Sequence, residues 1–302
     1  MGKSKRNSGP KQDSNRAAKL AQREAERESL QAAPVRPFQG VKAECDLVAM
    51  REFVPSATAP LVVVDGRSMT IATVLPGAVA ALVREESGDA RGFAGLQVQV
   101  HSPNVAADLS SALSWASIAQ PGESLESAGP DGNTPALKEV LDPTLELDIT
   151  VHQDFNWWIP ENSEPAADVA ATVERANQAI MPSARLEGEG LTAAWWVDAG
   201  DKAHLRWVRP ESEDELMLAL ARLHAAGDLS LGEGSRYAGS FRTHGLLVPV
   251  FDLDSEMHPA EWVAPTIEFG NKLAEALSVD APLTSEQRRS RDGLRSRQGP
   301  LR

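Results

Sequence analysis

The chain has 302 residues, 30 of them Lys or Arg and 43 Asp or Glu, with 42% hydrophobic residues and one cysteine, Cys45. This composition predicts a globular body of one large or two ordinary domains, and the single cysteine excludes an intramolecular disulfide and favours a reducing, cytoplasmic environment. No run approaches the roughly 18 apolar residues of a spanning helix, and the start MGKSKRNSGPKQ lacks an apolar stretch, so we expect neither membrane insertion nor export.

Residues 1–36 form an expected basic arm, with nine Lys or Arg against four acidic residues. Residues 1–13 are polar and predict disorder, whereas residues 14–33 are rich in Ala, Glu, Arg and Leu and favour a helix. Two interpretations stay open, a solvated helical arm and a helix that forms on binding an anionic partner. The basic side chains expected to make such contacts are Lys3, Lys5, Arg6, Lys11, Arg16, Lys19 and Arg23.

A first α+β subdomain is expected over residues 37–119, from the alternation of helical and extended patterns. Residues 120–135, QPGESLESAGPDGNTP, have the composition of a linker. The expected elements before it are a helix at 44–53, a hairpin that turns at Asp65-Gly66, a short helix at 76–83, a strand near 95–100 and a helix at 103–117.

A second α+β subdomain is expected over residues 136–284, followed by a basic, disordered tail at 285–302 with six Arg against two acidic residues. Between the two basic tails, residues 37–284 hold 15 basic and 37 acidic residues. The expected elements are a short helix at 136–141, a strand at 145–152, a helix at 166–180, strands at 191–197 and 204–208, a helix at 212–226, strands at 237–241 and 246–252, and a helix at 259–277.

The order of elements in the two halves is similar: a helix, paired strands, a helix, further strands and a helix. The sequence therefore predicts an α+β fold of two mixed sheet and helix subdomains, with an internal duplication as one interpretation and an α+β chain without internal symmetry as the other.

Four basic side chains on the predicted hairpins of the second half are the best candidates for a binding site. His204 and Arg206 are two residues apart on one strand, and Arg242 and His244 are two apart near another hairpin, so each pair lies on one face of its strand. If the hairpins share a sheet, the four residues can form a cationic pocket for a phosphate or carboxylate. The alternative is a solvated polar face whose arginines pair with acidic residues.

Sequence motifs of common enzymes are missing. The chain contains no HExxH, no GxxxxGK[ST], no GxGxxG after a strand and no GxSxG, so it predicts no metal, no cofactor and no assignable catalytic residue. The adjacent pairs Trp157-Trp158 and Trp195-Trp196 predict either rings buried on both sides of a sheet or a surface on which a peptide or a base stacks.

Five strings of residues resemble an uncharacterised bacterial family of high-GC Gram-positive bacteria, over about residues 36–302. They are RPFQGVKAECDLVAMREFVPSAT, HLRWVRP, ALARLHAAG, GEGSRYAGSFRTHGLLVPVFDL and DAPLTSEQRR. Members of that family carry the labels topoisomerase II or SecA-like preprotein translocase. The zinc knuckle implied by the second label does not carry over, because no Cys or His precedes Cys45. A type II topoisomerase needs a strongly cationic DNA gate, which the acidic body does not provide, although Arg236-Tyr237 supplies the Arg-Tyr dipeptide that this enzyme uses.

The sequence favours a cytoplasmic, non-enzymatic binding or adaptor protein, whose acidic body engages protein and whose basic arms contact RNA, the ribosome or DNA. A hydrolase or transferase acting on a small molecule at the four-residue cationic face is the alternative. The third hypothesis is a dimerisation module whose basic arm aids solubility.

Overall fold

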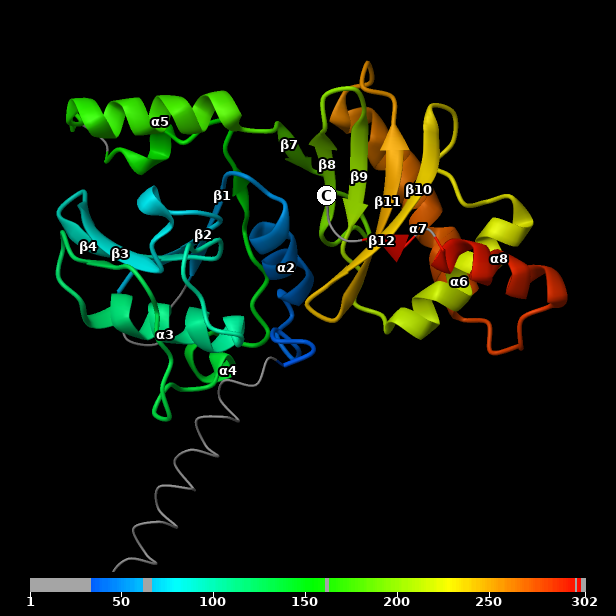
Figure 1. Cartoon of the computed structure of the whole chain (residues 1–302), viewed down its shortest axis with the longest axis horizontal. Coiled ribbons are helices and arrows are strands. Elements are labelled where there is room, and N and C mark those ends of the chain that lie inside the picture. The colour runs from blue at the N-terminus through cyan, green and yellow to red at the C-terminus, as the bar shows by residue number, and fades with distance from the viewer. Residues whose placement is uncertain (1–33, 62–66, 161–162, 297, 300–302) are drawn as a thin grey trace, which may run out of the picture.

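The computed structural model of the chain describes residues 34–61, 67–160, 163–296 and 298–299, which form two six-stranded sheets with helices packed on them (Figure 1). This arrangement is the predicted α+β fold. None of the helices within these residues is both long and apolar enough to cross a bilayer.

The first sheet has the strand order β5-β3-β4-β2-β1-β6, and α3 packs against its β2, β3 and β4 strands. The elements of this half are α2 (Glu44–Glu52), β1 (Ala57–Leu61), β2 (Met69–Ala72), η1 (Pro76–Ala78), β3 (Ala81–Glu86), β4 (Asp89–Gly95), α3 (Val105–Ile118), β5 (Ser124–Leu125), α4 (Leu137–Val140), β6 (Thr150–Val151) and η2 (Asn156–Trp158).

The second sheet has the strand order β12-β10-β11-β9-β8-β7, and α6 and α7 cover one of its faces. The elements of this half are α5 (Ala167–Ala179), β7 (Ser183–Arg185), β8 (Ala194–Asp198), β9 (Ala203–Trp207), α6 (Glu213–Ala226), β10 (Ser235–Thr243), β11 (Leu246–Leu253), η3 (Pro259–Trp262), α7 (Val263–Leu277), α8 (Ser285–Arg295) and β12 (Gln298–Gly299).

The central strands of the two sheets follow the same order, β3-β4-β2-β1 and β10-β11-β9-β8, but their directions differ. β2 and β4 are parallel, whereas β9 and β11 are antiparallel. The connection explains the difference, since only the short η1 joins β2 to β3, whereas the 14-residue α6 joins β9 to β10. A helix of that length spans about 21 Å and carries the chain back to the opposite end of the sheet. The halves share a strand order but are not copies of one topology.

α2 lies between the two sheets and joins them into one core (Figure 1). Its Leu47 and Met50 are fully buried, in the same cluster as Ile71 of the first sheet and as Trp195 and Val248 of the second. Ion pairs add to this contact: Arg185 of β7 meets Asp46 at 2.9 Å, and Arg36 meets Glu44 at 2.6 Å. Arg36 also donates to the carbonyl of Pro210, so this residue of the expected arm belongs to the folded body.

Several elements differ from the prediction. Residues 81–95 form the hairpin β3-β4, not a helix at 76–83 and a strand at 95–100. Ser87 and Gly88 both have positive φ, which suits a tight turn between strands. The expected linker at 120–135 supplies β5 to the edge of the first sheet, and residues from the expected second subdomain supply α4 and β6 to the same half.

The tail expected to be disordered instead begins with the helix α8, which packs on α6. Thr284 caps α8 by accepting a hydrogen bond from the backbone N–H of Gln287, and the Gln287 side chain accepts one from the N–H of Thr284. Leu294 is only 1% exposed and anchors the helix. A capping box and one buried leucine therefore hold a helix in a segment whose composition alone predicts disorder.

Candidate functional site

The four predicted site residues do not come together, because they lie on both faces of the second sheet. Here the α2 face is the one that carries Trp195, Val197 and Val208, and the α6 face is the one covered by α6 and α7. His204 and Arg206 register with Asp252 and Val250 and lie on the α2 face. Arg242 registers with Leu247 and pairs with Glu213 of α6, so it lies on the α6 face.

His244 lies in the turn between β10 and β11, apart from the other three residues. His244 and Gly245 have φ values of 47° and 74°, the two left-handed positions of a two-residue hairpin turn. The turn directs the imidazole at α2, where Nε2 lies 2.7 Å from Oε1 of Glu52. Burial alone would raise the pKa of Glu52, but the hydrogen bond and charge of His244 hold it below the usual value. This contact ties the hairpin to α2.

At the other end of the α2 face, three basic side chains share one carboxylate. Oδ2 of Asp252 accepts from Lys202 at 2.8 Å and from Arg236 at 2.7 Å, and Oδ1 lies 3.5 Å from His204. Burial opposes the charged form, but the hydrogen bonds from Lys202 and Arg236 hold the pKa of Asp252 below its usual value. Burial and the charge of Arg206 lower the pKa of His204.

Arg206 is 8% exposed, and its side chain makes no hydrogen bond or ion pair with any residue that the structure describes. Its guanidinium carbon lies 5.5 Å from the centre of the Phe53 ring, at the end of α2. Burial lowers the pKa of Arg206, with no acidic neighbour to oppose that effect. The sequence identified this residue, but its isolation depends on which neighbours the fold supplies and has no local signal.

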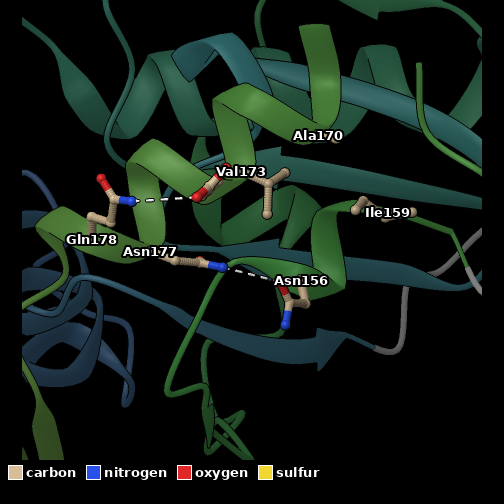
Figure 2. Close-up of a pocket in the computed structure, with 7 residues that line it drawn as sticks. Asn156, Ile159, Ala170, Val173, Asn177 and Gln178 are labelled. Carbon is tan, nitrogen blue, oxygen red and sulfur yellow. Dashed lines mark hydrogen bonds between the residues drawn. The ribbon is translucent and has the colours of Figure 1, made fainter. Parts of the chain in front are cut away.

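A groove of about 370 Å³ runs between α5 and the η2 segment (Figure 2). Val173 and Ile159 supply apolar surface, and Asn177 donates to the side chain of Asn156 at 3.0 Å. Gln178 lies 3.5 Å from Glu174 (Figure 2). Among the lining residues, Glu174 carries the single charge, so the groove has no convergent set of charged groups that would select a ligand.

The tryptophan pairs are largely occupied by internal contacts. Trp195 and Trp196 point to opposite faces of β8 and are both buried, as expected for a sheet covered on both sides. Trp157 and Trp158 belong to η2, and their indole N–H groups donate to Ser56 and to the carbonyl of Val74. These bonds favour a structural role for both rings.

α8 carries a basic surface that sequence reasoning placed in a disordered tail. Arg288 and Arg289 are exposed, and their side chains make no ion pair or hydrogen bond within the described residues. Arg291 pairs with its neighbour Asp292 at 3.0 Å, and Arg295 meets Asp214 at 3.3 Å. A capped helix thus presents two uncommitted guanidinium groups to solvent.

The other predicted contacts lie elsewhere in the chain. Lys3, Lys5, Arg6, Lys11, Arg16, Lys19 and Arg23 lie outside the described residues. Among the residues that are described, no three His, Cys, Asp or Glu side chains gather as a metal site.

A protein-family model matches residues 37–302, which is most of the chain. No curated protein and no solved structure matches it.

Proposed function

The chain belongs to DUF5926, a family of unknown function, and we propose that it is a cytoplasmic, non-enzymatic binding protein that contacts nucleic acid through its basic segments. The observation that carries this proposal is the surface of α8, where Arg288 and Arg289 are exposed and uncommitted. Guanidinium groups bind phosphates in a bidentate manner, which suits a nucleic-acid backbone.

The order of α8 strengthens the proposal. The helix is capped at Thr284 and anchored by the buried Leu294, and Ser290 lies 3.0 Å from His224 of α6. Side chains on an ordered helix lose less conformational entropy on binding than the same side chains on a disordered tail. The basic residues of segment 1–33 would add a second, sequence-independent attraction.

The acidic body limits where a polyanion can bind. Residues 37–284 carry 37 acidic and 15 basic residues, so most of the surface repels nucleic acid. The small-molecule enzyme considered from the sequence needs a pocket of four residues, and these residues lie on two faces and in a turn. That geometry favours the binding role.

The experiment is a fluorescence-anisotropy titration of single-stranded RNA with the full chain over a range of salt concentrations. The slope of log K against log salt is negative, and each lost phosphate contact reduces its magnitude by about 0.7 for a single strand. The double variant Arg288→Ala/Arg289→Ala should therefore make the slope shallower by about 1.4. The matched control, Lys138→Ala/Arg175→Ala, removes the same charge from two other exposed positions and should leave the slope unchanged.

Two results would contradict the role of α8: no RNA binding by the full chain, or equal slopes for the α8 variant and the control. A version that lacks residues 1–33 keeps Arg36 and measures the contribution of the arm separately. If that deletion alone abolishes binding while the α8 variant binds normally, the arm carries the function and α8 does not.

A further inference from the structure

The α2 face of the second sheet changes from apolar to cationic along β9. Val208 is fully buried beneath α2, whereas Arg206, His204 and Lys202 follow at alternate positions and therefore lie on the same face. Arg236 of β10 joins them through Asp252, with which it is in register. We call these four residues, Lys202, His204, Arg206 and Arg236, the cationic strip.

Asp252 balances only one end of the cationic strip. Its Oδ2 accepts hydrogen bonds from Lys202 and Arg236, and its Oδ1 lies 3.5 Å from His204. Arg206 is two residues beyond His204 on β9, opposite Val250 of β11 and Trp195 of β8. Both flanking partners are uncharged, so the register leaves the guanidinium of Arg206 without a carboxylate.

An unpartnered arginine at this depth is energetically unfavourable. A buried charge is normally paired, because removing it from water costs several kcal/mol that only hydrogen bonds and an opposite charge offset. Arg206 is more than nine-tenths buried, and its guanidinium makes a cation–π contact with the ring of Phe53, at 5.5 Å from the ring centre. The indole N–H of the adjoining Trp195 is also buried and without an acceptor. Donors therefore exceed acceptors in this row of the sheet.

The chemistry of the missing acceptor follows from the donors. A guanidinium has five N–H donors in a planar fork and no acceptor, which matches the two oxygens of a carboxylate or phosphate. No nitrogen of Arg206 is among the fully buried, unpaired atoms, so the fork retains contact with solvent. His204, with its side chain 25% exposed, borders the same face.

We propose that Arg206, bordered by His204 and the rest of the cationic strip, forms a binding site for a small oxyanion, either free or as the phosphate or carboxylate group of a larger ligand. The site is separate from the basic surface of α8, because α8 packs on α6, which covers the opposite face of the sheet.

The test is a titration of the full chain with inorganic phosphate and, separately, with acetate at constant ionic strength. The reporter is the indole N–H resonance of Trp195, identified by its loss in Trp195→Phe, together with the thermal midpoint. We expect saturable movement of that resonance and a rise in the midpoint. A response to phosphate alone assigns a phosphoryl ligand, and a response to acetate alone assigns a carboxylate.

Variants of Arg206 show whether this side chain binds the oxyanion. Losing a hydrogen bond to a charged group costs about 1.5–3 kcal/mol, so Arg206→Met should weaken the response about ten- to hundredfold. Arg206→Lys keeps the charge without the fork and covers the case in which the Met variant does not fold. Arg242→Met, on the opposite face, is the control. The proposal is wrong if the Trp195 resonance does not move with either probe, or if both Arg206 variants respond like the wild type.

Binding of a larger phosphorylated ligand is distinguished by adding a short single-stranded RNA to the same samples. RNA that shifts the Trp195 resonance in the Arg288→Ala/Arg289→Ala variant but not in Arg206→Met binds through the cationic strip. RNA that leaves this resonance unchanged while free phosphate moves it shows that the site takes small oxyanions only. Either result supports the site independently of the proposed role of α8.

Discussion

Two glycines in helices of the second half should respond in opposite ways to the same substitution. Gly270 of α7 lies against Trp207, and a Cβ added there would be 3.1 Å from Cη2 of the indole. Gly293 of α8 has no atom within 4 Å of an added Cβ. Neither glycine has a positive φ, so alanine fits the backbone at both positions.

Trp207 has little freedom to move away. The side chain is 1% exposed, and its Nε1 donates to the carbonyl of Thr192 at 2.9 Å. The guanidinium of Arg209 lies 4.7 Å from the ring centre, and the ring of Phe269 lies 6.4 Å away. The added methyl group must therefore strain either the indole or the packing of α7 on the sheet.

The magnitude follows from two opposing effects. Alanine is favoured over glycine inside a helix by up to about 1 kcal/mol, whereas an extra methyl in a packed core costs about 1–3 kcal/mol. Gly293→Ala should stabilise the protein by about 0.5–1 kcal/mol. Because the helix preference is common to both variants, Gly270→Ala should be less stable than Gly293→Ala by about 1–3 kcal/mol.

The assay is urea denaturation of the full chain, monitored by tryptophan fluorescence. The free energies of unfolding are compared between variants whose free energy depends on urea concentration with the same slope. Equal stabilisation by both substitutions would refute the reasoning, because it would mean that the indole of Trp207 yields without cost. Destabilisation by Gly293→Ala would show instead that α8 is not an independently exposed helix at that position.

Three further predictions concern the anchors of the fold. Leu294→Ala should cost about 2–5 kcal/mol and free α8 from α6, because the leucine is 1% exposed, and faster tryptic cleavage within α8 would show it. The lowered pKa of Glu52 gives stability that is present above the unfolded pKa of about 4.3 and is lost as the pH falls through the folded pKa. His244→Gln should therefore reduce the loss of stability between neutral and acidic pH, which urea midpoints at several pH values would measure. Cys45 should react with thiol reagents at pH 8 only after unfolding, since burial raises the pKa of its thiol to about 12, and rapid labelling of the native protein would contradict this.

Local signals were sufficient for the longer helices. The helix predicted at 212–226 matches α6, which the structure shows to be capped by Ser212 at its start and by Gly227 at its end, both local features. β9 follows from apolar alternation and β8 from a short continuous apolar run, and the opposite orientation of Trp195 and Trp196 follows from strand geometry. These features depend on neighbours within a few residues.

Features that depend on distant partners were not predictable in the same way. β5 and β6 are two-residue strands whose pairing is set by β3 and β1, far away in the chain. The β3-β4 hairpin was missed because its outer positions hold charged residues such as Arg84 and Glu85, which obscure the alternation. α8 was missed because only one of its residues is apolar and buried.

The predicted four-residue pocket is ruled out by the register of the sheet. Arg242 is opposite Leu247 and Arg206 is opposite Val250, and these two residues of β11 are three apart and face opposite ways. A β-bulge separates a further pair of arginines on β10. Arg236 and Arg242 are six residues apart and would face the same way on a regular strand, but the register shifts between Tyr237 and Gly239. Arg236 therefore reaches Asp252 on the α2 face, and Arg242 reaches Glu213 on the α6 face. Gly239 is the one local mark of the bulge, and the register of β11 against β9 has no local signal, so the predicted four-residue pocket could not have been rejected from the sequence.

The two proposed anion sites should differ in their response to salt because they differ in depth. Arg288 and Arg289 are exposed on α8, so their attraction to a polyanion is screened by ions over about 8–10 Å at physiological salt. Arg206 is buried, and a buried charge is screened far less. Added chloride should therefore weaken RNA binding steeply while leaving the phosphate response of the Trp195 resonance nearly constant. A steep salt dependence of that response would place the phosphate on the exposed Lys202 and Arg236 at the end of the cationic strip, and not on Arg206.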